Sequence, residues 1–484
     1  MNNNLAKNII YKLILNIFNI CLPLIVSPYV LRVIGPENLG RINYAESIYT
    51  YFFAFASFGV YQYGIREVAK YRENKEKLSE FFTSCFVINL ISSISMLIIY
   101  IIFIRVNQSL DSLQIILIVY SINIFSNIFY VEWANEGFEN YKFITVKTVV
   151  IRIIYVVGIF ALVRKQEDFI YYVILNVLFI LFNNLTSFIF IKKNIGFNFK
   201  NLQIHCHIKY LLAGFIICNY GILFYQIDKT MLGTYGSELD VSLYSISNMI
   251  MFMILTMIQT ILTVSVPRLV KTMSDDSEEY NNLLNKLYKI YCMFTFPAAI
   301  GVIILSKYIL IFYGGSQYID ANLTLKLFSI FMIIINIEMF IRNQVLYING
   351  KEKIIAIYLL IAGVVNLVGN KIAIINLQLK SEGAILATII ASILLLTLEY
   401  IYILKNMKFK FKIISKDILK YIVSSLTFIP IYILLNNMIK NEIIVFILTI
   451  VLCVVSYFTM LAIFKDEFVY SILKMKSKKL TDKK

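Results

Sequence analysis

The chain has 484 residues, of which 59% are hydrophobic and only 15% are charged, and its formal net charge at pH 7 is +16. A water-soluble chain of this length would carry about 25% charged residues, so the composition excludes a set of soluble domains. The positive charge fits the cytoplasmic loops of a membrane protein better than a nucleic-acid-binding surface, because such loops collect Lys and Arg. We therefore expect a polytopic membrane protein with no nucleic-acid partner.

Apolar stretches long enough to cross a membrane recur along the whole chain. A hydrocarbon core about 30 Å thick needs about 20 helical residues, and stretches of that length predict about 14 transmembrane helices. The predicted spans are residues 9–33, 42–64, 81–104, 113–134, 143–163, 168–191, 208–232, 240–266, 287–312, 323–346, 353–375, 383–404, 417–437 and 442–464. Every span must be helical, because an open sheet would leave backbone groups unpaired in lipid, so the expected fold class is all-α.

Lys and Arg residues gather in alternate connections between the spans. An even number of spans puts both termini on one side of the membrane. If that side is the cytoplasm, the inner segments carry roughly three times as many Lys and Arg residues as the outer segments, which predicts cytoplasmic termini. The polar segment 65–80 is one of these inner connections, and its helical spacing predicts a helix along the membrane surface.

Two distant stretches of the sequence resemble each other. Arg32–Ile48 and Thr230–Ile250 both lie at an outer turn between two spans, and Gly35 in the first matches Gly233 in the second. Either apolar helices look alike by chance, or a six-span unit has been duplicated in parallel orientation, and we favour duplication. The predicted organisation is an N-terminal lobe over residues 1–206 (spans 1–6), a C-terminal lobe over 207–405 (spans 7–12), and a segment over 406–484 with spans 13–14 and a basic cytoplasmic tail.

Polar and charged residues inside the spans are the first candidates for function, because a charge costs about 2.5–3.5 kcal/mol at the membrane centre on insertion scales. Arg152 has no carboxylate within a helical turn in sequence, so it faces either a partner on another helix or a watery cavity, and we favour the cavity. Uncharged polar stripes in spans 7 and 8 either line that cavity or form hydrogen bonds in a packed seam. The candidate substrate-binding residues are Arg32, Arg152, Lys229, Asn248 and Gln226.

Acidic residues in or beside the spans are candidates for ion coupling. They are Glu46, Asp228 and Glu338. Glu338 stands four residues before Arg342, a spacing at which helical side chains also form an ordinary ion pair. An opposing flux of protons or sodium through these carboxylates would reset a transport cycle.

Enzyme and cofactor motifs are absent from the sequence. It has no G-x-x-x-x-G-K-[ST] loop to hold a nucleotide phosphate, and the triplet His205, Cys206 and His207 is an isolated cluster that predicts no metal site. No long outer loop is present to hold the catalytic residues of a membrane polymerase. Transport without a cofactor is therefore favoured over catalysis.

Three stretches resemble a known family. Ser27–Ile48 (SPYVLRVIGPENLGRINYAESI) resembles the opening signature of the Wzx-type polysaccharide-biosynthesis flippases, which belong to the multidrug/oligosaccharidyl-lipid/polysaccharide (MOP) exporter superfamily. Phe224–Ser247 resembles their second-half signature, and Tyr130–Thr145 resembles the exit of their fourth span. With the predicted spans, the resemblance covers nearly the whole chain.

The resemblance implies a fold and a function. The fold would have two parallel six-helix lobes around a central, often cationic cavity, as in the MOP superfamily, plus two C-terminal helices. The activity would be translocation of an undecaprenyl-pyrophosphate-linked oligosaccharide repeat unit across the bacterial cytoplasmic membrane by alternating access, for capsule, O-antigen or exopolysaccharide synthesis. Matching motif positions are the structural-turn glycines Gly35, Gly40 and Gly233, together with Arg32 and Asp228.

Partners and alternatives follow from the same resemblance. Membrane lipids surround such a protein, and polysaccharide polymerase or export machinery would act beside it. Within the superfamily, a lipid II flippase or a drug/cation antiporter is an alternative, although a cationic drug would favour an acidic cavity. A membrane-embedded repeat-unit polymerase is the alternative from a different class.

Overall fold

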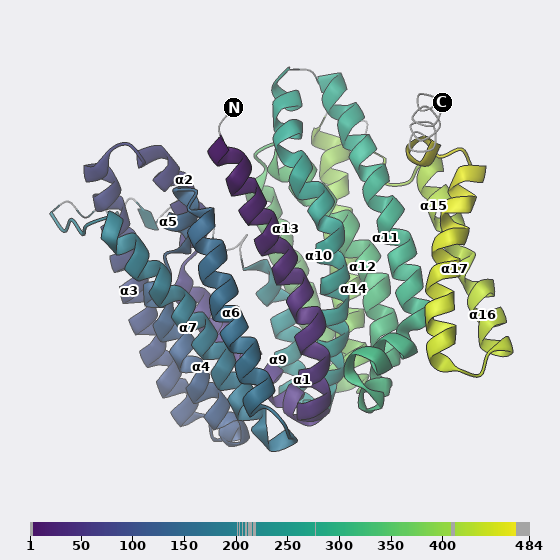
Figure 1. Ribbon diagram of the computed structural model, residues 1–484, viewed down its shortest axis with the longest axis horizontal. Helices are drawn as coiled ribbons and strands as arrows, with labels where there is room; N and C mark the ends of the chain where they lie inside the picture. The colour runs from purple at the N-terminus through teal and green to yellow at the C-terminus, as the bar shows by residue number, and fades with distance from the viewer. Residues whose placement is uncertain are drawn as a thin grey trace. The chain divides into compact units, whose positions relative to one another are not determined.

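The computed structural model describes residues 3–200, 219–275, 277–407 and 412–470, together with residues 202, 204, 205, 207, 208, 211 and 215. Over these residues the chain forms helices and no strand, which confirms the all-α prediction (Figure 1). Within them, 11 helical segments are long and apolar enough to cross a membrane. They coincide with predicted spans 3–6 and 8–14. The first predicted span and most of the second lie on one kinked helix, and residues 209, 210, 212–214 and 216–218 of the seventh lie outside the described residues, so the total of 14 stays a prediction.

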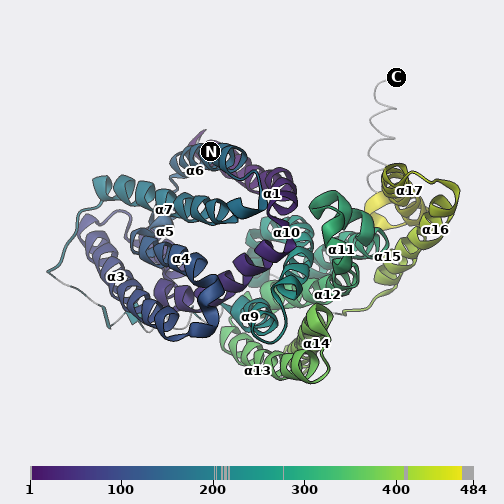
Figure 2. The ribbon, with the colours of Figure 1, turned by 90° about the horizontal axis from the view of Figure 1, so that it is seen from below.

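The contacts divide the chain into two compact units, Met1–Ser242 (unit 1) and Leu243–Lys484 (unit 2). The helices of unit 1 are α1 (Asn3–Ser57), α2 (Val60–Tyr71), α3 (Lys75–Val106), α4 (Gln114–Ser126), α5 (Glu132–Gly137), α6 (Tyr141–Leu162), α7 (Phe169–Asn194) and α9 (Tyr225–Tyr235). α1 packs against α3, α4, α6 and α9, and α6 runs beside α7 (Figure 1 and Figure 2). The predicted lobe boundary at residues 206 and 207 rests on the sequence repeat and stays a prediction, whereas the contacts group α9 with unit 1.

A kink divides α1 at the predicted outer turn. Gly35 has φ 76° and ψ 168°, a backbone conformation that glycine adopts readily and other residues rarely do. Pro36 follows directly, and the residue before a proline is held away from the helical conformation. The turn expected between the first two spans is therefore a sharp bend within one helix.

The turn between α6 and α7, over residues 163–168, is held against the kinked part of α1. The Tyr29 hydroxyl donates a hydrogen bond of 2.8 Å to the carbonyl oxygen of Val163. The Asn38 side-chain amide donates one of 3.0 Å to the carbonyl oxygen of Gln166. We call this pair of bonds the α1 clamp.

The single surface helix predicted over residues 65–80 is instead two helices. α2 ends at Tyr71 and α3 begins at Lys75. The break occurs because the Asn74 side chain caps α3, accepting a 3.0 Å hydrogen bond from the backbone nitrogen of Lys77. Asn is among the preferred residues at a helix N-cap.

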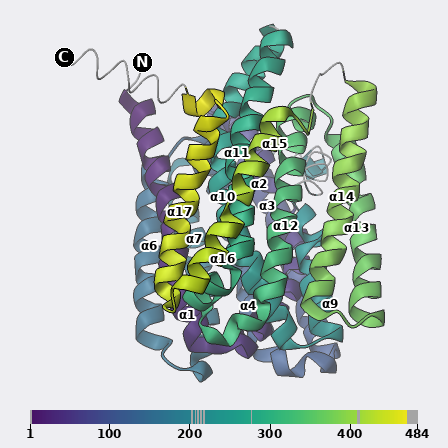
Figure 3. The ribbon, with the colours of Figure 1, turned by 90° about the vertical axis from the view of Figure 1, so that its right-hand side faces the viewer.

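Unit 2 is also helical. Its elements are α10 (Glu238–Asp275, which begins in unit 1), α11 (Ser277–Gly314), α12 (Asn322–Phe340), a π-helical segment (Ile341–Tyr347), α13 (Glu352–Asn370), a second π-helical segment (Lys371–Asn376), α14 (Lys380–Asn406), α15 (Lys416–Leu426), α16 (Phe428–Met438) and α17 (Glu442–Ile463). α13 and α14 pack side by side, and α12 packs against α11 and α14 (Figure 2). α16 and α17 form a pair beside α11 (Figure 3).

Candidate functional site

Two of the predicted turn glycines lie at close approaches between helices of unit 1. A Cβ at Gly40 would overlap the backbone carbonyl of Glu238, and a Cβ at Gly233 would overlap the ring of Tyr44. The Tyr44 hydroxyl lies 3.0 Å from the Thr234 hydroxyl. The glycines therefore let α9 and the start of α10 approach α1 closely, which a larger residue would prevent.

This close approach brings Lys229 of α9 to Glu46 of α1. The Lys229 ammonium lies 3.7 Å from a Glu46 carboxylate oxygen and donates a 3.1 Å hydrogen bond to the Asn43 side-chain oxygen. Lys229 is 8% exposed, and the neighbouring Asp228 is fully buried. The Glu46 side chain is 42% exposed. The Lys229 ammonium is thus buried, whereas the Glu46 carboxylate that it faces is partly exposed.

Further polar contacts join the same helices. The Thr230 hydroxyl donates to the Ser47 hydroxyl at 2.9 Å, and Tyr51 and Thr230 hydroxyls lie 3.1 Å apart. Arg41 pairs with Glu238 at 2.7 Å. Sequence analysis did not single out these side chains, because their partners are distant in sequence and each residue type is ordinary near a membrane surface.

Arg152 lies on α6, where it contacts two neighbouring helices. Its guanidinium donates to the side-chain oxygen of Asn19 on α1 and lies 5.2 Å from the centre of the Phe179 ring on α7. On the same helix the Tyr155 hydroxyl donates a 2.9 Å hydrogen bond to the Asn176 side chain. Arg152 is half-buried, and none of the described carboxylates forms an ion pair with it. An amide and a ring stabilise the cation without neutralising it.

We call Arg152, Tyr155, Asn176 and Phe179 the polar face of α6 and α7. All four side chains are half-buried. Tyr155 lies within electrostatic range of Arg152 and Tyr172. Arg152 therefore has partners on other helices, which was the alternative to a watery cavity. Neither partner carries a negative charge, so the positive charge of Arg152 stays available to an anion.

The other substrate-binding candidates are more scattered. Arg32 is exposed on α1, ahead of the kink. Gln226 is half-buried on α9, and its side-chain oxygen has no hydrogen-bond partner among the described residues. Asn248 belongs to unit 2, on α10, with 8% exposure and a side-chain oxygen equally without a described partner. Of the five candidates, Lys229 and Gln226 share one short helix.

The ion pair that the sequence spacing allowed for Glu338 is present in unit 2. The Nε atom of Arg342 lies 3.1 Å from a Glu338 carboxylate oxygen, and both side chains are buried. Sequence analysis missed Glu399 of α14, which is fully buried. Its position inside a predicted span was the signal that could have identified it, because a carboxyl there needs a reason.

A second missed cluster lies in unit 1. The Lys147 ammonium donates to Glu132 at 2.8 Å and to the Ser187 hydroxyl at 2.5 Å. Lys147 is 7% exposed. The three residues come from α6, α5 and α7, so their sequence separation hides the contact. The cluster satisfies a buried cation internally and leaves little charge for a ligand.

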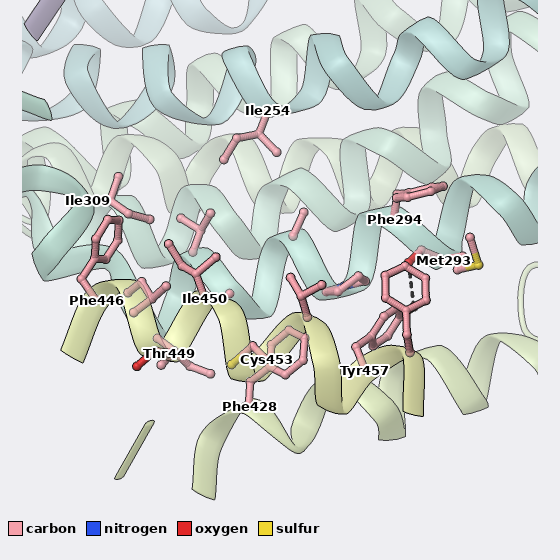
Figure 4. A pocket seen from close by; sticks show the side chains of 18 residues that line it. Ile254, Met293, Phe294, Ile309, Phe428, Phe446, Thr449, Ile450, Cys453 and Tyr457 are labelled. Atoms are coloured by element: carbon pink, nitrogen blue, oxygen red, sulfur yellow. Dashed lines mark hydrogen bonds between the residues drawn. The ribbon is translucent and has the colours of Figure 1, made fainter. Parts of the chain in front are cut away.

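An apolar cleft of about 450 Å³ lies in unit 2 beside α11, α16 and α17 (Figure 4). Its lining includes Phe294, Phe446 and Ile450, and no charged side chain is among the lining residues. The Tyr457 hydroxyl at one end donates to the Met293 carbonyl oxygen at 2.6 Å. Such a surface accepts hydrocarbon and offers nothing to a phosphate group.

The described part of the chain contains no group of three His, Cys, Asp or Glu residues that could hold a metal ion. In the triplet noted in the sequence, Cys206 lies outside the described residues. His207 lies 2.7 Å from the Tyr63 hydroxyl of α2, and burial lowers the pKa of this histidine.

Comparison with known proteins gives matches in sequence. The family model for polysaccharide biosynthesis proteins matches residues 5–273, more than half of the chain. A protein of Escherichia coli (strain K12) named as an O-antigen transporter is 26% identical over 175 residues, which cover 35% of this chain and 41% of that protein. A protein of Shigella dysenteriae with the same description is 20% identical over 369 residues, covering 75% of this chain and 91% of that protein. The match to the E. coli protein thus spans less than half of that relative.

Comparison of structures supports the fold. The solved structure of the lipid II flippase MurJ in an inward-closed conformation matches with a TM-score of 0.76 at 18% identity. The match covers 95% of this chain and 100% of that one. At this identity the likeness concerns the fold alone, and it confirms the expected all-helical, multi-pass architecture.

Proposed function

Because the chain belongs to the family of polysaccharide biosynthesis proteins, we propose that it is a flippase for a lipid-linked oligosaccharide repeat unit in the bacterial cytoplasmic membrane. The cargo in this proposal is an undecaprenyl-pyrophosphate-linked oligosaccharide of capsule, O-antigen or exopolysaccharide synthesis. The relatives named as O-antigen transporters support this cargo. Both termini are placed in the cytoplasm, and polymerase or export machinery would receive the translocated unit.

The observation that carries the proposal is the unneutralised cation on the polar face of α6 and α7. Arg152 lies within the part of the chain that the family model matches, and it is held by an amide and a ring instead of a carboxylate. A guanidinium offers forked donors that suit phosphate oxygens. Tyr155 and Asn176 beside it supply a ring surface and an amide for sugar hydroxyl groups.

The other candidate substrate-binding residues also contribute to binding the head group of the cargo. Lys229 adds a second positive charge, Arg32 adds an exposed one on α1, and Gln226 and Asn248 add unpaired side-chain oxygens that accept hydrogen bonds from sugar hydroxyls. The prenyl tail stays in lipid while the head group is bound. In alternating access these groups are open first to the cytoplasm and then to the outer side.

In this proposal, the acidic residues bind the cations that return the transporter to its starting state. Glu46 faces Lys229, so a phosphate arriving at Lys229 competes with Glu46 for the ammonium. Asp228 and Glu338 are fully buried, and a change in their charge state is costly without a compensating cation. A counter-flux of cations through these carboxylates would restore the starting state.

The test is flipping in proteoliposomes that contain the purified chain and an undecaprenyl-pyrophosphate-linked oligosaccharide. We expect Arg152→Ala to lower the initial flipping rate at least tenfold and Arg152→Lys to lower it less, because Lys keeps the charge but not the fork. The matched control is Arg164→Ala, at an exposed position in the turn between α6 and α7. Undiminished flipping with Arg152→Ala would contradict the assignment of cargo charge to this residue, and an inactive wild-type protein would contradict the proposed function.

A further inference from the structure

Three charged side chains meet in the interior of unit 2. Glu338 on α12 and Glu399 on α14 are fully buried, and Arg342 in the π-helical segment is 4% exposed. Arg342 pairs with Glu338 at 3.1 Å. α14 packs against both α12 and this π-helical segment, and Glu399 lies within electrostatic range of Glu338 and Arg342. We call the three residues the buried triad.

The charges of the buried triad do not balance. Two ionised carboxylates and one guanidinium leave one negative charge inside a membrane-spanning helix bundle. An uncompensated charge in such surroundings is strongly unfavourable, whereas a neutral carboxylic acid is tolerated. With the triad arranged and buried as observed, one additional positive charge is therefore needed.

The hydrogen-bonding capacity of the triad is also unfilled. Neither oxygen of Glu399 has a hydrogen-bond partner among the described residues. Buried polar atoms in folded proteins are nearly always satisfied, so the two buried oxygens of Glu399 without a described partner indicate a site that takes something up.

The described residues of the elements around the triad supply no second cation. α11, which packs against α12, contributes Tyr288 and Tyr291, and the Tyr291 hydroxyl donates a 2.5 Å hydrogen bond to Asn336. Tyr400 of α14 lies near Tyr288. The buried side chains described on α13 include no titratable group, and Lys371 of the second π-helical segment is exposed. Among the described residues of these elements, Arg342 is therefore the one cationic group within electrostatic range of Glu399.

We propose that Glu399 is a proton-binding residue whose protonation is coupled to the transport cycle. Uptake forms one O–H bond between a proton from water and a Glu399 carboxylate oxygen, and release returns that proton to water. A proton is favoured over a metal ion, because it needs one oxygen only and avoids placing a second full charge beside Arg342. The coupling rests on the proposed flippase function, whereas the proton site itself does not.

The triad also indicates how proton release would act on the π-helical segment that carries Arg342. With Glu399 protonated, Arg342 pairs with Glu338, as observed. When Glu399 loses its proton, two carboxylates compete for one guanidinium. Arg342 lies near the start of a π-helical segment, and such interruptions of the α-helical pattern often mark functional positions. A shift of Arg342 between the carboxylates would therefore alter this segment first.

The proton site is tested by infrared difference spectroscopy of the purified full chain in lipid, without cargo. We expect a carboxylic-acid C=O band that disappears on raising the pH, is lost in Glu399→Gln, and returns shifted in Glu399→Asp. The control is Glu352→Gln, at an exposed residue that begins α13, and it should keep the band. A band that survives in Glu399→Gln, or one that sodium ions remove at constant pH, would overturn the proposal.

Two more measurements separate folding and transport from proton binding. Gln mimics the protonated carboxyl, so Glu399→Gln should match the wild-type melting temperature at acid pH and should lose the part of its pH dependence that Glu399 contributes, and the match also shows that the variant folds. In proteoliposomes, the wild-type flipping rate should respond to an imposed pH gradient, and the Glu399→Gln rate should not. Loss of the infrared band with an unchanged gradient response would reject the coupling alone, while absence of wild-type flipping would reject the proposed function and leave the proton site standing.

Discussion

At the scale of single residues, two glycines allow helices of unit 1 to pack closely where a larger side chain would hold them apart. Gly40 and Gly233 have no side chain where a backbone carbonyl and an aromatic ring press against them. Lys229 of α9 reaches Asn43 and Glu46 of α1 only because of this approach. The glycines and the buried cation are therefore parts of one arrangement.

Gly40→Ala and Gly233→Ala should each lower stability, by about 1–3 kcal/mol for overpacking. The effect of Gly40→Ala should be larger, because its Cβ meets backbone while that of Gly233 meets a side-chain ring. Thermal unfolding of the purified variants measures this. The control is Gly301→Ala within α11, where nothing lies within 4 Å of the added Cβ. Equal melting temperatures for all three variants would contradict the packing shown here.

A second residue-scale prediction concerns Lys229 and Glu46. Their distance is 3.7 Å and the Glu46 side chain is 42% exposed, so the pair should contribute less than about 1 kcal/mol to stability. A double-mutant cycle with Lys229→Met and Glu46→Gln measures the coupling in thermal unfolding. We expect a small coupling energy and, for Lys229→Met, a loss of flipping. A large coupling energy with normal flipping would make the pair a structural contact.

At the scale of elements, α2 is joined to the segment that contains His207. The Tyr63 hydroxyl and the His207 ring form a 2.7 Å hydrogen bond, and Phe81 of α3 packs edge-on against the same ring. Burial lowers the pKa of His207. In the neutral ring, Nδ1 either accepts from the Tyr63 hydroxyl or donates to it, depending on the tautomer, whereas the protonated ring only donates.

This contact should weaken in acid. Because the folded pKa of His207 lies below its ordinary value of about 6.5, the unfolded state binds more protons between the two values. The contribution of neutral, buried His207 to the stability of the folded state is therefore complete above about pH 6.5, and it declines as the pH falls toward the folded pKa of His207. The protection factors of amide hydrogen exchange in α2, which correct for the intrinsic pH dependence of exchange, should fall across this range, and Tyr63→Phe should lower them at every pH. His205→Gln, at the exposed neighbouring histidine, is the control; an unchanged profile in His207→Gln would contradict the assignment.

At the scale of the whole molecule, the predicted orientation can be measured directly. Ser316 and Lys165 lie in connections predicted to face outward, and Lys353 lies in one predicted to face the cytoplasm. In a cysteine-free variant, a membrane-impermeant maleimide should label Ser316→Cys and Lys165→Cys in intact cells. Lys353→Cys should react only after permeabilisation. Labelling of Lys353→Cys in intact cells would reverse the orientation.

Hydropathy predicted much of the fold, because a membrane span is recognisable from a local stretch of sequence. Apolar stretches predicted the positions of the candidate spans that the structure describes, which lie between Lys75 and Asn194 and between Glu238 and Ile463. The site was predicted less completely. Spacing revealed the pair of Glu338 and Arg342, but the contact of Arg152 with Asn19 and Phe179 joins three helices. Contacts of that kind depend on tertiary packing, for which the sequence carries no local signal.

The α1 clamp has a consequence for experiments that scan the protein by substitution. Both acceptors in the clamp are main-chain carbonyl oxygens, in Val163 and Gln166. Every amino acid offers that oxygen, so alanine at Val163 or Gln166 leaves both acceptors of the clamp in place. Asp168→Ala is different, because the Asp168 carboxylate accepts from the backbone nitrogens of Arg164 and Lys165 and so shapes the turn. A one-residue deletion, which displaces both carbonyl oxygens, would reveal how much the bend depends on them.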